Sequence, residues 1–301
     1  MSRSAGIVRR MRGPVVPLNV CFNEDATVDF DAVARYTGWL AESGVPIIIL
    51  SSGSSEYAYL TEAETFKLAE VMARAIDGRA LFVAATGWWK TTTTAEYLKH
   101  ADAVGADAVK FQPHPGLKAD RDTWGRYLDT VSAASDIPLL LLDPPAAFSA
   151  ELAARPNVVG AKVHDIGDYY DLIRDTKDEE FSVMCAGQMQ KQVFGYELGS
   201  PAYLCPIAPF LPDVANAFFD LLEQSRYDDA LSYTFKYEEP WMKTAVAAGW
   251  LPAIKEAIRL RGLYPNNLPC PPQQPIAAAQ SEAVRATIEE VFGPIERVDL
   301  T

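Results

Sequence analysis

The sequence predicts an α/β protein: a closed (β/α)8 TIM barrel with an appended C-terminal helical segment. Eight short apolar runs alternate with segments of helical spacing along most of the chain. No linker rich in glycine or serine separates these units into halves. A length of 301 residues suits one barrel of about 250 residues with additional helices.

The apolar runs are each short enough for a strand and too short for a helix. Near-continuous Val, Ile and Leu, as in residues 46–50, is typical of a parallel strand covered on both faces. The expected strands are residues 14–19, 46–51, 80–85, 107–111, 138–142, 158–163, 181–186 and 202–205. An open doubly wound sheet is the main alternative, but residues 19–22 lack the glycine-rich turn that usually follows its first strand.

Helices are expected where apolar residues recur three and four positions apart, as in residues 30–43, 62–76, 93–104 and 208–224. Asp29 and Thr61 precede two of them as capping residues. Further helices are expected over residues 227–247, 252–260 and 277–291, with a proline-rich break at 265–275. The chain therefore divides into an N-terminal extension (1–12), the barrel (13–225) and C-terminal helices packed on it (226–301).

Composition excludes several classes of function. A formal charge of −13 argues against nucleic-acid or anionic-membrane binding, which would require a basic face. No stretch approaches the roughly 18 apolar residues of a membrane span. The four cysteines are scattered without a CxxC pair, so neither a zinc site nor a disulfide framework is indicated. We expect a cytoplasmic protein.

Lys162 is the strongest single signal for chemistry. Catalytic residues of such barrels project from the C-terminal ends of strands, and Lys162 interrupts the apolar run 158–161 near such an end. Strand alternation places Gly160, Lys162 and His164 on one face. If that face is the barrel interior, burial would lower the pKa of Lys162 by about three units and give a nucleophilic free amine near neutral pH. A strand-end lysine that reaches to water is the alternative.

Two of the three histidines, His114 and His164, also fall at predicted C-terminal strand ends. An imidazole there could transfer protons at neutral pH, although an inert hydrogen-bonded histidine is an equal alternative. His100, on a predicted helix, is expected at the surface. A metal site built from His114, Asp143 and His164 is a further alternative, but these residues have no diagnostic ligand spacing, and we expect no metal.

The loop 51–56, with the sequence SSGSSE, follows the second strand. Its hydroxyls and backbone N–H groups could bind a carboxylate, which makes Gly53, Ser54 and Ser55 candidate substrate contacts. A polar turn that caps the next helix is the alternative, and Glu56 is expected to support the loop. Asp143 and Gly187, after the fifth and seventh strands, are the other candidate substrate contacts.

Together these segments resemble the dihydrodipicolinate synthase/N-acetylneuraminate lyase family of class I aldolases, over residues 13–268. The segment 12–30 resembles the opening strand and turn of the family, and residues 52–56 occupy the place of its Gly-Thr-Thr-Gly-Glu loop. Residues 157–162, NVVGAK, match the strand that ends in the Schiff-base lysine. Residues 251–255 and 260–263 resemble the C-terminal helices.

The resemblance implies a barrel, usually a homotetramer, that binds pyruvate or another 2-keto acid as an iminium on Lys162 without a cofactor. It also implies that Ser54 and Ser55 hold the keto-acid carboxylate. Three positions depart from the family. Its active-site tyrosine falls at Leu142, its carboxylate-binding arginine falls near Ala147, and its tyrosine pair after the fourth strand is replaced around His114. These losses argue against dihydrodipicolinate synthesis itself.

We therefore expect a Schiff-base-forming lyase or aldolase acting on pyruvate or another 2-keto acid, with His114 or His164 in place of the lost tyrosine. The alternatives are a 3-deoxy-2-keto acid dehydratase and a non-catalytic family member that binds a keto acid. An aldehyde is the expected co-substrate, and Tyr57, Trp88 and Phe148 would suit a bulky or aromatic one; core packing is the alternative explanation of these aromatics. The expected assembly is a homotetramer or a homodimer.

Overall fold

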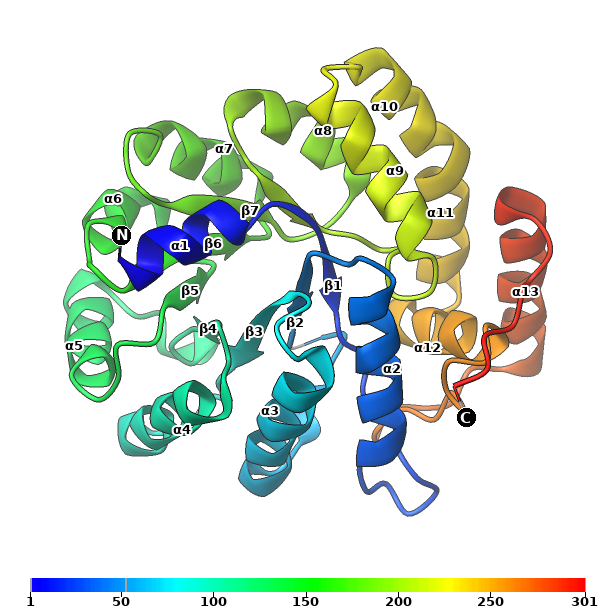
Figure 1. Ribbon diagram of the computed structural model, residues 1–301, viewed down its shortest axis with the longest axis horizontal. Helices are drawn as coiled ribbons and strands as arrows, with labels where there is room; N and C mark the ends of the chain where they lie inside the picture. Colours follow the sequence, from blue (N-terminus) through cyan, green and yellow to red (C-terminus); the bar gives the residue numbers. More distant parts are fainter. Residues whose placement is uncertain (1, 52, 301) are drawn as a thin grey trace.

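The computed structural model describes residues 2–51 and 53–300 as a closed barrel of eight parallel strands that pair in sequence order (Figure 1). Each strand overlaps the run expected for it. The strands are β1 (Gly13–Pro17), β2 (Ile47–Ile49), β3 (Leu81–Ala85), β4 (Ala108–Phe111), β5 (Leu139–Leu142), β6 (Val158–Val163), β7 (Ser182–Cys185) and β8 (Ala202–Leu204). The predicted TIM barrel is confirmed.

The helices between the strands form the outer ring (Figure 1). They are α2 (Phe30–Glu42), α3 (Glu62–Ile76), α4 (Thr91–Val104), α5 (Arg121–Ser132), α6 (Ser149–Ala153), α7 (Ile166–Asp175), α8 (Met189–Leu198) and α9 (Pro212–Glu223). The predicted caps form: the Asp29 side chain accepts a hydrogen bond from the Ala32 N–H, and Thr61 and Glu64 make a capping box.

A helix that the sequence pattern did not indicate closes the N-terminal end of the barrel. Helix α1 (Arg3–Arg10) lies across β6 and β7 in Figure 1. Its Ile7, together with Met11 that follows the helix, is buried against inward-facing side chains such as Val159. The first twelve residues are therefore more than an extension, because they cover apolar surface that would otherwise face water.

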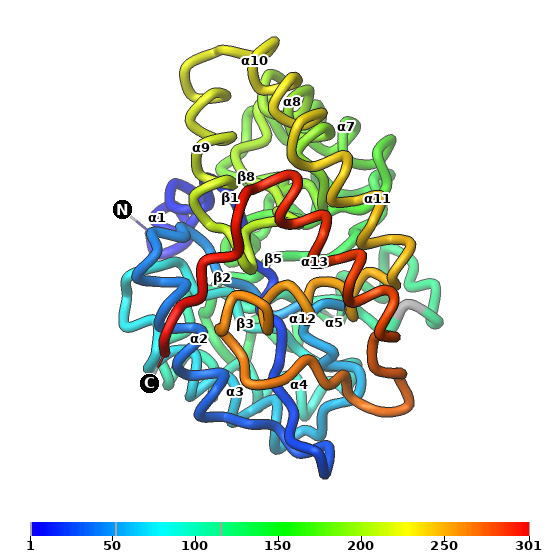
Figure 2. Tube along the Cα trace, turned by 90° about the vertical axis from the view of Figure 1, so that its right-hand side faces the viewer, coloured from blue at the N-terminus to red at the C-terminus, as the bar shows by residue number. Residues whose placement is uncertain are grey.

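The C-terminal segment is a set of helices packed beside α8 and α9, with α13 (Ala278–Phe292) outermost (Figure 2). The single helix expected over 227–247 is divided into α10 (Tyr227–Tyr233), a π-helical turn (Thr234–Glu238) and α11 (Glu239–Ala247). Pro240 lies at the start of α11, and it has no N–H and its ring crowds the carbonyl one turn back, which explains the widened turn.

Helix α12 (Trp250–Leu260) connects this segment to the loop after β2. Its Lys255 places Nζ 2.5 Å from Oε2 of Glu56, and both side chains are almost fully buried. The other Glu56 oxygen accepts a hydrogen bond of 2.7 Å from the Cys270 N–H, and Lys255 donates to the Leu268 carbonyl at 2.7 Å. Glu56 therefore anchors the loop, as expected, rather than facing a substrate.

Within the described ranges, no helix has both the length and the apolar character needed to cross a membrane.

Gly160→Ala should destabilise the strand that carries Lys162. A Cβ at this position would lie 2.3 Å from the Ser182 carbonyl oxygen on β7, so the two strands must move apart. Overpacking of this kind costs about 1–3 kcal/mol. Gly6→Ala is the matched control: it meets no atom within 4 Å in α1 and should stabilise by up to about 1 kcal/mol. Urea unfolding of both variants measures the difference, and equal stabilities would contradict the expected clash.

Lys255→Met should leave the Glu56 carboxylate buried without a cation. Removing one partner of a buried ion pair costs about 3–5 kcal/mol of the free energy of unfolding. The double variant Lys255→Met/Glu56→Gln removes the stranded charge while keeping an oxygen for the Cys270 N–H, so it should recover part of the loss. A double variant no more stable than Lys255→Met in urea titrations would contradict a charge-based anchor.

Candidate active site

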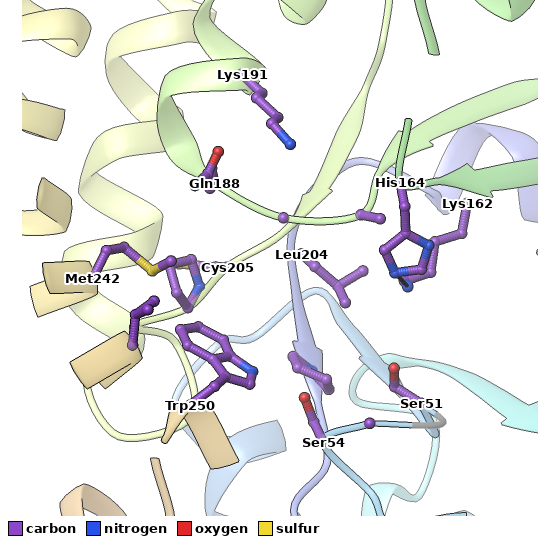
Figure 3. Close-up of a pocket in the computed structure, with 16 residues that line it drawn as sticks. Ser51, Ser54, Lys162, His164, Gln188, Lys191, Leu204, Cys205, Met242 and Trp250 are labelled. Atoms are coloured by element: carbon purple, nitrogen blue, oxygen red, sulfur yellow. Dashed lines mark hydrogen bonds between the residues drawn. The ribbon is translucent and has the colours of Figure 1, made fainter. Parts of the chain in front are cut away.

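A cavity of about 360 Å³ opens at the C-terminal ends of the strands (Figure 3), within the size range of small-molecule sites. Its lining residues among those described are Pro17, Ser51, Gly53, Ser54, Lys162, His164, Ala186, Gly187, Gln188, Lys191, Leu204, Cys205, Pro206, Met242, Val246 and Trp250. Five residues expected at the site therefore come together: Gly53, Ser54, Lys162, His164 and Gly187.

Lys162 lies on the inward face of β6 and is only 1% exposed. Burial lowers its pKa to about 8, while the charges of Asp143 and Cys185 act in the opposite direction. A lowered pKa is what we expected if strand alternation turned Lys162 toward the barrel interior. A lysine of this pKa holds about one part in ten as free amine at pH 7.

His164 and Asp143 form a hydrogen-bonded chain with this amine. Nε2 of His164 lies 3.1 Å from Nζ of Lys162, and Nδ1 lies 2.8 Å from Oδ2 of Asp143. The other carboxylate oxygen accepts from the His164 backbone N–H at 2.8 Å. Because Nδ1 faces a carboxylate, it carries the proton in the neutral ring, which leaves the Nε2 lone pair directed at Lys162.

Asp143 therefore acts on His164 and does not line the cavity among the described residues. Burial favours a raised pKa for its carboxyl group, but the hydrogen bond and charge of His164 outweigh burial and lower the pKa. The residue has a positive φ of 45° just after β5, which lets its carboxylate turn back toward β6. The arrangement resembles the aspartate–histidine pairs that hold a general base in one tautomer.

The loop after β2 presents Ser54 to the cavity, opposite Lys162 and His164 in Figure 3. Asn19, buried at the end of β1, donates to the Ser54 carbonyl at 3.0 Å. The Ser55 hydroxyl is bound within the loop instead: it donates to the Leu18 carbonyl and accepts from the Ser51 N–H at 2.9 Å. Ser55 thus fixes the loop rather than lining the cavity. Ser52 lies outside the described residues.

The loop after β7 supplies Gly187, Gln188 and, at the start of α8, Lys191. Both oxygens of the buried Glu238 carboxylate accept N–H groups from the first turn of α8, those of Met189 and, at 3.0 Å, Gln190. Burial raises the pKa of Glu238 to about 7, while these hydrogen bonds act to lower it. The C-terminal segment therefore stabilises the start of α8, which forms this wall of the cavity.

Several cavity residues were not anticipated from the sequence. Lys191 lies on α8, and Met242, Val246 and Trp250 come from the C-terminal helices α11 and α12. Candidate residues were expected at the C-terminal ends of strands, and Lys191 lies beyond such an end, inside a helix. The other three belong to amphipathic helices whose apolar faces look like ordinary packing surface in the sequence.

His114 does not line this cavity. Its ring packs edge-on against Trp88 at 5.5 Å between centroids, and its Nδ1 accepts from the Gly116 N–H at 3.0 Å. Trp88 in turn packs against Tyr57 at 6.1 Å. Tyr57 and Trp88, predicted for the substrate pocket, thus lie with His114 outside the described lining of the cavity, and Phe148 lies instead beside Arg121. His100 is half-buried against Phe66, with Nε2 3.0 Å from its carbonyl, and is not simply at the surface.

Leu142 pairs with Lys162 across β5 and β6 and is 3% exposed, so the position beside the lysine holds no hydroxyl. Within the described part of the chain, no three His, Cys, Asp or Glu side chains are arranged to bind a metal ion.

Comparison with known proteins identifies the family. Residues 10–291 match the model of the dihydrodipicolinate synthetase family. An uncharacterised DapA-like lyase of Thermococcus kodakarensis is 27% identical, covering 94% of this chain and 100% of that one. A probable 5-dehydro-4-deoxyglucarate dehydratase of Streptomyces coelicolor is 26% identical, covering 86% of this chain and 84% of that one.

Among solved structures, this fold is similar to YagE, a prophage protein of the dihydrodipicolinic acid synthase family from E. coli K12 in complex with pyruvate. The TM-score is 0.84 at 21% identity, covering 94% of this chain and 99% of that one. A family match over nearly the whole chain thus accompanies the barrel and its buried lysine. The chain belongs to the dihydrodipicolinate synthetase family and is a lyase or aldolase of that family.

Proposed function

We propose that this protein is a class I lyase that forms a Schiff base between Lys162 and pyruvate or another 2-keto acid. The observation that carries the proposal is the contact between the buried Lys162 amine and Nε2 of His164, at 3.1 Å, in the wall of a ligand-sized cavity. A lysine amine that loses its proton near neutral pH is the nucleophile such chemistry needs.

The first step moves a proton along this hydrogen bond. Lys162 gives one ammonium proton to Nε2 of His164, and Asp143 stabilises the imidazolium through Nδ1. The free amine then attacks the keto carbon. The resulting alkoxide takes one proton from the attacking nitrogen and becomes a hydroxyl. His164 then returns its proton to this hydroxyl, which leaves as water, and an iminium that keeps one N–H remains on Lys162. The histidine thus starts and ends neutral.

Opposite the lysine, Ser54 and Gly53 would bind the keto-acid carboxylate. Gly187 also lines the cavity, and because it has no side chain it would leave room for the bound acid. Hydroxyl and backbone N–H groups bind carboxylates well in a site from which water is excluded. Ser55 and Asn19 support this role by fixing the loop.

The iminium can withdraw electrons to break either a C–C or a C–O bond. Loss of water from a 3-deoxy-2-keto acid is the second candidate, and the dehydratase name of the Streptomyces coelicolor relative favours it. A purely binding function is disfavoured because a buried lysine without use is costly to folding. No step requires a cofactor, since the iminium itself accepts the electrons.

We further propose that the protein self-associates as a homodimer or homotetramer. Tyr59, Trp88 and Leu117 are large apolar side chains between 38% and 65% exposed, on the loops that follow β2, β3 and β4. Exposed apolar surface of this kind is typical of a protein interface. The net charge of −13 fits a small-molecule enzyme with neither a nucleic acid nor a membrane as partner.

Borohydride treatment with pyruvate should attach a stable adduct to the peptide that contains Lys162. The adduct should be absent in Lys162→Ala and unchanged in Lys99→Ala, which alters an exposed lysine on α4. Its yield should rise between about pH 6 and pH 9, because the free amine becomes dominant above a pKa of about 8. Peptide mass mapping measures both. A wild-type protein that gives no adduct with any 2-keto acid would overturn the Schiff-base function.

Lys191→Met should reveal whether the substrate has an anionic distal end. Lys191 points its amine into the cavity from the first turn of α8, apart from Lys162 on β6 (Figure 3), and a hydrogen bond to a charged group contributes about 1.5–3 kcal/mol. The KM for a keto acid with a distal carboxylate should then rise at least tenfold, with pyruvate trapping unchanged and Lys191→Arg much less affected. Equal losses for pyruvate and the dianion would contradict a distal contact.

A further inference from the structure

A second lysine, Lys110, lies inside the barrel, and nothing in its sequence context marked it. It is the third residue of β4, and its side chain is fully enclosed at 1% exposure. Nζ lies 3.3 Å from the hydroxyl of Tyr57 and 4.7 Å from the centre of its ring. Tyr57 is itself buried, in the short helix that follows the serine loop.

Strand register places Lys110 level with Lys162. Lys110 on β4 pairs with Leu140 on β5, which in turn pairs with Gly160 on β6. Lys162 therefore lies two residues further along β6 than the residue in direct register with Lys110, and these two residues are gained over two strands. An eight-stranded barrel with a shear of about eight advances one residue per strand at constant height. Lys110 and Lys162 therefore belong to one layer, and the same count gives Ile49 and Leu204 as its other members.

This layer can hold only one positive charge at modest cost. Neither lysine makes an ion pair within the described residues, because the nearby Asp143 is bound to His164. Two ammonium groups in one dry layer would repel each other strongly. Burial lowers the pKa of Lys110 well below its ordinary value, the charge of Lys162 lowers it further, and Asp143 opposes both. While Lys162 carries an ammonium or an iminium, Lys110 is therefore a neutral amine with a free lone pair.

The flanks of Lys162 in this layer differ in chemistry. Leu204 on β8 has no atom that can accept a proton, whereas Lys110 on β4 presents an amine. Leu204 lines the cavity, whereas Lys110 lies outside its described lining but close enough to Lys162 to be affected by its charge. A keto acid whose carboxylate points toward Ser54 would direct its C3 carbon toward one of these two flanks, of which only Lys110 can accept a proton. His164, which also lines the cavity, is the competing base that the test must separate from Lys110.

We propose that Lys110 is the base that removes the C3 proton of the keto acid bound to Lys162, with the Tyr57 hydroxyl orienting its amine. This inference rests on the proposed Schiff-base function. The C3–H bond breaks, its electron pair forms the C2–C3 double bond, and the iminium π pair returns to the Lys162 nitrogen. The proton goes to Nζ of Lys110. The iminium charge disappears as the Lys110 ammonium forms, so the layer holds one positive charge before and after the step.

The test separates formation of the adduct from proton removal. Lys110→Met should still give the borohydride adduct on Lys162, while exchange of the pyruvate methyl protons with D2O, followed by NMR, falls at least about 100-fold, the lower end of the contribution of a general base. Tyr57→Phe should lower exchange by a smaller factor. Lys99→Met should change neither measurement.

Lys110→Ala with added methylamine is a second variant, since the truncated side chain leaves space for the amine. Exchange should recover with methylamine concentration in this variant and not in wild type, which a packing role for Lys110 would not produce. Circular dichroism checks that both variants are folded.

Exchange at wild-type rate in a folded Lys110→Met that still traps the adduct would overturn this inference and leave the Schiff base intact. The inference would also be overturned if His164→Asn formed the borohydride adduct but lost exchange, while Lys110→Met kept exchange. Absence of any adduct in wild type would instead overturn the proposed function, and this inference with it.

Discussion

The structure depends on one constraint: the amine of Lys162 is kept out of water inside a closed barrel. A lysine at the end of β6 would normally extend to solvent, but its side chain is enclosed by the inward faces of the neighbouring strands. Lowering its pKa from 10.5 to about 8 corresponds to about 3 kcal/mol of lost preference for the charged form. The rest of the site makes this buried group useful by giving its proton a destination at His164.

The two ends of the barrel serve different purposes. The N-terminal end is sealed by α1, whose Ile7 continues the apolar filling between the strands. The C-terminal end remains open as a cavity, and its floor consists of Lys162 and Leu204 rather than a uniform apolar layer. Apolar burial at the sealed end provides stability that the polar end cannot contribute, because amines placed there cost free energy.

The C-terminal helices are part of the site rather than an attachment to it. Two buried side chains of these helices, one acidic and one basic, show how they act. Glu238 binds the first turn of α8 and so fixes the loop after β7, and Lys255 pairs with Glu56 to fix the loop after β2. The same helices supply Trp250 to the cavity wall. Both substrate-facing loops are therefore held by charged groups from beyond the eighth strand.

The sequence by itself determined the strands, most of the helices between them and the face that Lys162 shares with Gly160. These features depend on short-range periodicity, which also put His164 on the same face two residues later. The contact of His164 with both Lys162 and Asp143 could not be predicted, because it depends on the turn that follows β5.

Only the tertiary structure decided which side of the barrel mouth forms the cavity. His114 and Lys191 both follow strands at the same end, yet of the two only Lys191 lines the cavity, to which α11 contributes Met242 and Val246 and α12 contributes Trp250. Similarly, Lys110 reads in sequence as an ordinary strand residue, and its level with Lys162 follows from the tilt and register of three adjacent strands. Local spacing fixes the face of a strand to which a residue belongs, but long-range packing fixes what that face meets.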